Sequence, residues 1–191
     1  MVWLHNEFMN LHNNADNLSD KEFLKEFEII KETFEGRKEY LTECANVVKE
    51  LYSSPLKVFE PASGIGIFSE IMNRLGYDSI GLEPENCITY RYCKLKNIPI
   101  LKCYRWYSEW ELENKEFDLI VIISYHDHDK ANELWDNLHN YIEKGTKIIF
   151  FDLRQVDYFK EKIIECKTIT YKEISAMNKP FGNKIVVFEK I

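Results

Sequence analysis

The chain has 191 residues, a formal net charge of −7 at pH 7 and 45% hydrophobic residues. This length and composition suit one domain with a substantial core and exclude an intrinsically disordered chain. The net negative charge argues against broad electrostatic attraction to nucleic acids or anionic membranes.

The cysteines and the N-terminus indicate the cellular compartment. The five cysteines are odd in number and include no Cys-x-x-Cys pair, so we expect reduced thiols. The first residues lack the basic start and apolar core of a signal peptide, and no segment has the length and apolarity of a membrane span. We therefore expect a cytoplasmic protein without membrane contacts, and a homodimer is compatible with the sequence.

The first fifty residues predict an arm followed by two helices. Residues 5–18 are polar and rich in asparagine, which predicts a loosely ordered arm. The segment 19–22, Ser-Asp-Lys-Glu, has the pattern of a helix-capping box. Apolar residues follow it at helical spacing, at Phe23, Phe27, Ile30 and Phe34. Gly36 interrupts this pattern, and a second helix is predicted over residues 37–52.

From residue 56 onward, strand and helix patterns alternate. The predicted strands are 56–60, 79–83, 98–103, 117–123 and 147–151, and the predicted helices are 67–75, 85–96, 129–143 and a segment near 155–165. The run 117–123 is almost continuously apolar, as expected for a strand that is buried on both faces of a parallel sheet. This alternation predicts a doubly wound α/β fold.

The last part of the chain has a different pattern. Two strand-like runs, 167–173 and 184–189, are separated by a turn-rich stretch with no helical pattern. A connection of this kind favours an antiparallel pair over another parallel crossover.

The most informative motif joins the first predicted strand to the helix after it. Glu60 ends the strand, and a Gly-x-Gly turn follows at Gly64 and Gly66. Glycines allow a sharp turn there, and the N–H groups at the start of a helix attract anionic or polar ligand groups. Glu83 ends the next strand, seventeen residues after Gly66. A carboxylate at that position can accept both hydroxyls of a ribose.

These residues resemble the class I S-adenosylmethionine-dependent methyltransferases. The family's first motif, acidic-x-Gly-x-Gly-x-Gly, is matched by residues 60–66, with Glu60 in place of the commoner Asp and Ala62 in place of the first Gly. The resemblance covers residues 37–191. It implies a Rossmann-like, seven-stranded, mostly parallel sheet with an antiparallel C-terminal hairpin. We expect one domain over 1–191, with an N-terminal arm and helical lid at 1–52 and the core at 56–191.

The resemblance also implies roles for single residues. Glu60 is expected near the methionine amino group of the cofactor, S-adenosylmethionine, whereas Glu83 is expected to hold its ribose hydroxyls. In the family, the segment after strand 117–123 faces the reactive methyl group and the acceptor. The complete set of expected cofactor-binding residues is Glu60, Ala62, Gly64, Gly66, Glu83, Pro84, Tyr104 and Ser124.

Two histidines follow Ser124 and are candidates for the base that removes a proton from the acceptor. His126 is the first candidate and His128 the second, because the ordinary pKa of histidine lies near neutrality. Asp127 and Asp129 alternate with them, which leaves a metal site or a helix cap as other readings. Alternating residues of an extended segment point to opposite sides, and no matching ligand cluster occurs elsewhere, so we expect no metal.

The expected reaction is methyl transfer to an oxygen or nitrogen of a small metabolite or natural-product intermediate. Enzymes of the family that methylate base amino groups or protein glutamine carry a polar-Pro-Pro-aromatic motif where this chain has residues 124–126, Ser-Tyr-His. The small acceptor would lie under the helical lid, whose aromatic residues include Trp3, Phe8, Phe23 and Tyr40.

Two other functions stay open at this stage. The missing first Gly of the motif, and the aromatic loop 103–107 where the family often has an Asp for the adenine, leave a non-catalytic S-adenosylmethionine-binding interaction module as an alternative. A nicotinamide-dependent oxidoreductase is less favoured, although Gly64, Gly66 and Ser69 approximate its G-x-G-x-x-G motif.

Overall fold

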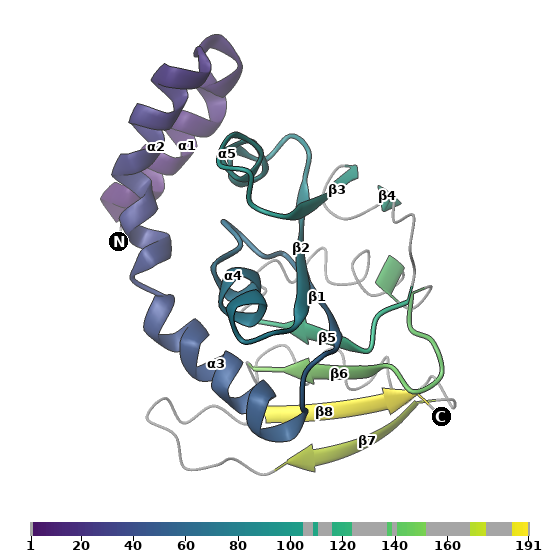
Figure 1. The fold of residues 1–191 in the computed structure, drawn as a ribbon. Coiled ribbons are helices and arrows are strands. Elements are labelled where there is room, and N and C mark those ends of the chain that lie inside the picture. The colour runs from purple at the N-terminus through teal and green to yellow at the C-terminus, as the bar shows by residue number, and fades with distance from the viewer. Residues whose placement is uncertain are drawn as a thin grey trace.

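The computed structural model has a mixed β-sheet with helices packed against it (Figure 1), and it describes residues 2–104, 109–110, 116–123, 137–138, 141–151, 169–174 and 185–190. The helices are α1 Val2–Asn14, α2 Asp20–Glu35, α3 Lys38–Leu51, α4 Ile67–Arg74 and α5 Ile88–Leu95, with a 3-10 turn at Ala15–Asn17. The strands are β1 Lys57–Pro61, β2 Asp78–Pro84, β3 Ile100–Tyr104, β4 Glu109–Trp110, β5 Leu119–Ile122, β6 Lys147–Phe150, β7 Ile169–Ile174 and β8 Ile185–Lys190.

Within the described residues, the sheet has eight strands in the order β4-β3-β2-β1-β5-β6-β8-β7. The five strands from β3 to β6 in this order are parallel, whereas β4, β8 and β7 each pair antiparallel with their neighbour. The expected count of seven omitted β4, because a strand of two residues shows no periodic pattern. β2 and β3 follow β1 in sequence and lie on one side of it, whereas β5 lies on the other side of β1. The strand order therefore reverses between β1 and β5, where open α/β sheets bind their ligands.

The N-terminal arm predicted at residues 5–18 is wrong as a description of this segment, which forms α1 and the 3-10 turn. Leu11 and Ala15 are buried, and Phe8 packs against the same apolar cluster as α2. Asparagine is a poor helix former, so the composition suggested irregular structure. Burial of this sparse apolar face against another helix stabilises α1 instead, which a local reading of the sequence does not detect.

The predicted capping box at the start of α2 is confirmed. The backbone N–H of Ser19 donates to Glu22 Oε2 at 3.0 Å, and the Ser19 hydroxyl accepts from the Glu22 backbone N–H. Gly36 follows the last residue of α2, and α3 begins two residues later. The helices therefore begin and end close to where the sequence signals predicted.

The pair α1–α2 is anchored on α5 (Figure 1). Arg91 of α5 donates hydrogen bonds to the backbone carbonyls of Ala15 and Leu18, and pairs with Asp20 at 2.8 Å. The rings of Phe27 and Tyr92 stack with centroids 4.3 Å apart. These contacts fix the position of the two helices relative to the sheet.

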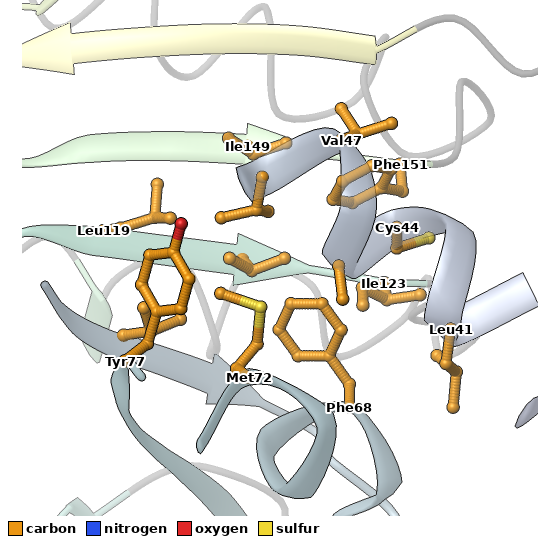
Figure 2. Close-up of a cluster of buried hydrophobic side chains, with 14 of the residues drawn as sticks. Leu41, Cys44, Val47, Phe68, Met72, Tyr77, Leu119, Ile123, Ile149 and Phe151 are labelled. Atoms are coloured by element: carbon orange, nitrogen blue, oxygen red, sulfur yellow. The ribbon is translucent and has the colours of Figure 1, made fainter. Parts of the chain in front are cut away.

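The larger apolar cluster lies between the sheet and helices α3 and α4 (Figure 2). Phe68 and Met72 of α4 are fully buried against Leu119 of β5, and Val47 of α3 is nearly so. Complete burial of a large apolar side chain stabilises a fold by about 1.5–3 kcal/mol. This packing holds α4 against the sheet, and with it the loop that precedes α4.

Candidate functional site

The glycine motif forms the loop that joins β1 to α4 at the carboxyl end of the parallel strands. Three of its residues have positive φ angles, at +60° for Ala62, +61° for Gly64 and +74° for Gly66. Alanine rarely adopts this left-handed conformation, so Ala62 retains a backbone geometry typical of glycine at the first glycine position of the motif. Gly66 is the residue directly before α4, so the loop leads straight into the first turn of that helix.

Glu60 is a buried carboxyl group beside this loop, with 3% of its surface exposed. The Ser69 hydroxyl of α4 donates to Glu60 Oε2 at 3.0 Å. Burial raises the pKa of Glu60 to about 8, and this hydrogen bond only partly opposes the effect. Without a bound cation, the group is therefore mainly protonated at pH 7.

Glu83 is the second buried carboxyl group and connects β2 to the same loop. Its Oε1 accepts the backbone N–H of Gly64 at 2.6 Å, and its Oε2 accepts the Thr89 hydroxyl at 2.7 Å. Burial raises the pKa of Glu83 to about 7, against these two hydrogen bonds. The loop, the end of β2 and the first turn of α5 thus meet at one carboxyl group.

A small cleft of about 50 Å³ lies against the loop. Three residues from the N-terminal helices line one side, namely Phe34, Arg37 and Leu41. The Phe34 ring lies 3.6 Å from the position that a Cβ on Gly64 would occupy. The remaining lining residues come from the end of β1, the loop, the first residue of α4 and the residue after β5, and are Glu60, Ala62, Ser63, Gly64, Ile65, Ile67 and Ile123.

The structure brings four predicted site residues together: Glu60, Ala62 and Gly64 line the cleft, and Glu83 is bonded to Gly64. Pro84 is buried at the end of β2. The backbone of Tyr104 ends β3, but its side chain lies outside the described part of the structure. Ser124, His126 and His128 also lie outside the described residues, directly after the cleft residue Ile123.

Three of the four aromatic residues expected to line an acceptor pocket, Phe8, Phe23 and Tyr40, have other contacts, whereas the side chain of Trp3 lies outside the described part of the structure. Phe23 has no exposed surface and packs in the cluster shared by α2 and α5, while the Arg91 guanidinium lies over its ring at 4.4 Å. The Tyr40 hydroxyl donates to the backbone carbonyl of Phe151 at 3.1 Å. Phe23 is thus a core residue, and Phe34, which the sequence assigned only to helix packing, is the one that lines the cleft.

Three residues at the site had no role in the sequence interpretation of the methyltransferase motif. Ser69 and Thr89 bind the two buried carboxyl groups, and Arg37 lines the cleft. The sequence did carry a signal for Ser69 and Thr89. Each is a hydroxyl residue in the first turn of a helix, and each of these helices follows a strand with an acidic residue near its end. No local signal points to Arg37, because its place depends on how α2 and α3 pack against the core.

No group of three or more His, Cys, Asp or Glu side chains that could hold a metal ion occurs among the described residues. The segment 126–129 lies outside them. In the same part of the chain, no helix combines the length and apolarity needed to cross a membrane.

Comparison with known proteins reveals similarity at the level of the fold. No family model and no curated protein sequence matches the chain. A TehB-like SAM-dependent methyltransferase from Corynebacterium glutamicum is 18% identical, with a TM-score of 0.60 over 84% of this chain and 97% of that one. A putative S-adenosyl-L-methionine-dependent methyltransferase from Methanococcus maripaludis is 14% identical, with a TM-score of 0.61 over 89% and 93%.

A third similar structure is the glycopeptide N-methyltransferase MtfA complexed with sinefungin. It is 13% identical, with a TM-score of 0.58 over 78% of this chain and 85% of that one. The chain thus has the Rossmann-like fold of class I SAM-dependent methyltransferases. At these identities the similarity concerns the fold, and the acceptors of the compared proteins do not transfer to this chain.

Proposed function

We propose that this protein is an S-adenosylmethionine-dependent methyltransferase that acts on an oxygen or nitrogen atom of a small molecule. The observation that carries the proposal is the pair of buried carboxyl groups, Glu60 and Glu83, beside the loop 62–66 at the strand reversal. The fold supports the same activity, since MtfA was solved with sinefungin, an analogue of S-adenosylmethionine.

Of the two buried carboxyl groups, Glu60 fits the cationic end of the cofactor. Glu60 lines the cleft, and burial without a cation raises its pKa to about 8. A cation in the cleft would favour the ionised carboxylate and form a charge-assisted hydrogen bond with it. We therefore assign Glu60 to the α-ammonium group of the methionine part.

Glu83 fits the ribose. A carboxylate has about four lone-pair positions, of which Gly64 and Thr89 use one on each oxygen and the Cys87 thiol uses a third. The group thus retains capacity for a hydroxyl donor. The bonds to Gly64 and Thr89 also fix the orientation of the side chain before any ligand binds, which lowers the entropic cost of binding.

The reaction requires an acceptor held in line with the methyl group. When bound, S-adenosylmethionine supplies an electrophilic methyl carbon for direct displacement by the acceptor atom. We assign removal of the acceptor's proton to His126 or, second, to His128, which come a few residues after β5 in the sequence. Pro84, Tyr104 and Ser124 remain assigned to the cofactor by position.

A small acceptor is favoured over RNA or protein by the charge of the chain. The formal net charge of −7 disfavours association with a polyanion, and residues 124–126 lack the polar-Pro-Pro-aromatic motif. We therefore expect a metabolite or natural-product intermediate as the acceptor, and a cytoplasmic enzyme.

Calorimetric titration with S-adenosylhomocysteine, with NADH as the comparison ligand, tests the cofactor assignment. We expect micromolar binding of S-adenosylhomocysteine alone, and loss of most of that affinity in Glu83→Ala. The lost charge-assisted hydrogen bonds contribute roughly 1.5–3 kcal/mol each. Glu39→Ala, which removes an exposed carboxylate of α3, is the control and should bind normally. Binding of NADH alone would refute the proposal and favour an oxidoreductase.

Activity is tested by screening small molecules for transfer of a labelled methyl group from S-adenosylmethionine. With the acceptor in hand, His126→Ala should bind the cofactor normally and react about a hundredfold more slowly. His139→Ala is the matched control, because no role is assigned to that histidine. A normal rate in His126→Ala would remove the base role from this residue. Cofactor binding without transfer to any compound would instead favour the interaction-module alternative.

A further inference from the structure

One charged side chain of the cleft has no part in the function proposed above. Arg37 lies between α2 and α3, and its side chain forms no capping hydrogen bond at the start of α3. It lines the cleft together with Phe34 and Leu41. The lid thus presents a cation to the loop between β1 and α4.

Arg37 and Glu60 are the two charged residues among those described around the cleft. Arg37 forms no ion pair with a carboxylate in the part of the chain that the structure describes, so it does not neutralise Glu60 directly. Glu60 becomes the negative charge of the cleft when a cation binds beside it. The interaction of Arg37 with Glu60 acts at longer range: burial raises the pKa of Glu60, while Ser69 and, more weakly, the Arg37 charge lower it. A cleft with one group of each sign is complementary to a ligand that carries both charges.

The size of the cleft limits the ligand group that enters it. A volume of about 50 Å³ holds roughly four water molecules. An amino-acid head group, with its α-carbon, ammonium and carboxylate, has a similar number of heavy atoms. A nucleoside is much larger than this volume, and the proposed function assigns it to Glu83, which does not line the cleft. The cleft therefore suits the amino-acid end of a ligand, and its two charges match the two charges of that end.

We propose that Arg37 binds the α-carboxylate of the cofactor's methionine part, opposite the α-ammonium group held by Glu60. This inference rests on the proposed function and extends it, because it assigns part of cofactor recognition to the lid. Arginine is well suited to this role, since its planar guanidinium binds a carboxylate through two parallel hydrogen bonds. Binding would then connect the α2–α3 junction to the loop 62–66 through the ligand.

The test uses two ligands that differ only in the carboxylate. S-adenosylhomocysteine carries both charges of the amino-acid end, whereas its decarboxylated analogue keeps the ammonium group alone. Calorimetry measures the affinity of each ligand for the wild type, Arg37→Ala and Arg37→Lys. Glu60→Gln is included because it removes the proposed carboxylate partner of the ammonium group, which both ligands carry. Lys38→Ala is the matched control, since it deletes an exposed cation one residue away.

We expect Arg37→Ala to weaken S-adenosylhomocysteine binding about tenfold, which allows for solvent screening of an exposed arginine. The decarboxylated analogue should bind Arg37→Ala as it binds the wild type. Arg37→Lys should restore part of the affinity for S-adenosylhomocysteine, because it keeps the charge without the two-pronged geometry. Glu60→Gln should weaken both ligands, and Lys38→Ala should change neither by more than about twofold.

Several results would overturn this assignment. An equal loss for both ligands in Arg37→Ala would indicate a structural role, and circular dichroism of the variant checks whether its fold is retained. Unchanged binding of both ligands would also overturn it, and Arg37 would then be free to bind an acidic acceptor. Failure of the wild type to bind S-adenosylhomocysteine refutes the proposed function itself, which is a different outcome from selective failure of the Arg37 assignment.

Discussion

Burial of Glu60 predicts an unusual dependence of stability on pH. The pKa of this carboxyl is about 8 in the folded protein and 4.5 in its ordinary state, because burial disfavours the charged form. The folded state therefore keeps a proton that the unfolded state releases. The stability from this raised pKa is fully present below pH 4.5 and is lost as the pH rises through 8. Between these values the loss is about 1.4 kcal/mol per pH unit, or about 3 kcal/mol from pH 5.5 to 7.5.

The substitution Glu60→Gln removes this titration and keeps an oxygen that can accept the Ser69 hydroxyl. Urea denaturation of the ligand-free protein at pH 5.5, 6.5 and 7.5 measures the effect. The free energy of unfolding of the variant, relative to wild type, should rise by about 3 kcal/mol over this interval. Glu83 also titrates in both proteins, and its charge adds to the raised pKa of Glu60, so the difference between variant and wild type includes this smaller coupling between the two groups. Glu39→Gln, at an exposed position, should follow the wild type. A difference between Glu60→Gln and wild type that does not change with pH would refute the reasoning.

Three further predictions concern the loop, the lid and proton release. Gly66→Ala combines a φ of +74° with a Cβ only 2.8 Å from a side-chain carbon, whereas Gly145→Ala has a φ of +87° and open space. Urea denaturation should show the first to be the more destabilising, by about 1–3 kcal/mol, and equal losses would contradict the clash. Arg91→Met removes the hydrogen bonds that anchor α1 and α2, and should speed amide exchange in both helices. Arg74→Met, which removes an exposed ion pair, should leave that exchange unchanged, and equal rates in the two variants would argue against the anchor. Calorimetry of S-adenosylhomocysteine binding at pH 7, in buffers of different ionisation enthalpy, should reveal net proton release, because the two buried carboxyl groups ionise when they meet their ligand partners. No release would mean that they are already ionised in the free protein.

Several helices, strands and loops could be predicted because their signals lie in residues that are close together in the sequence. The capping box of residues 19–22, the glycine breaks and the apolar run 117–123 each act through residues close together in the chain, so their elements could be predicted. The same holds for the loop 62–66 and for acids at the ends of β1 and β2, because a strand end places its last residues at the carboxyl edge of a sheet. The short β4 and the helix α1 were missed, since two residues show no period and α1 depends on burial against its neighbours.

Tertiary structure alone decided how these parts meet. The hydrogen bond from Gly64 to Glu83 joins residues nineteen positions apart, and the direction of each side chain follows from the packing of α4 and α5 on the sheet. Arg37 reaches the cleft because Arg91 anchors α1–α2 on α5, while α3 packs against α4. The raised pKa values of the two acids likewise depend on burial, which is a property of the assembled core. Preferences for helix, strand or turn depend on residues that are close in the sequence. The cleft and the desolvation of the two carboxyl groups arise only when segments far apart in the sequence pack together and exclude water.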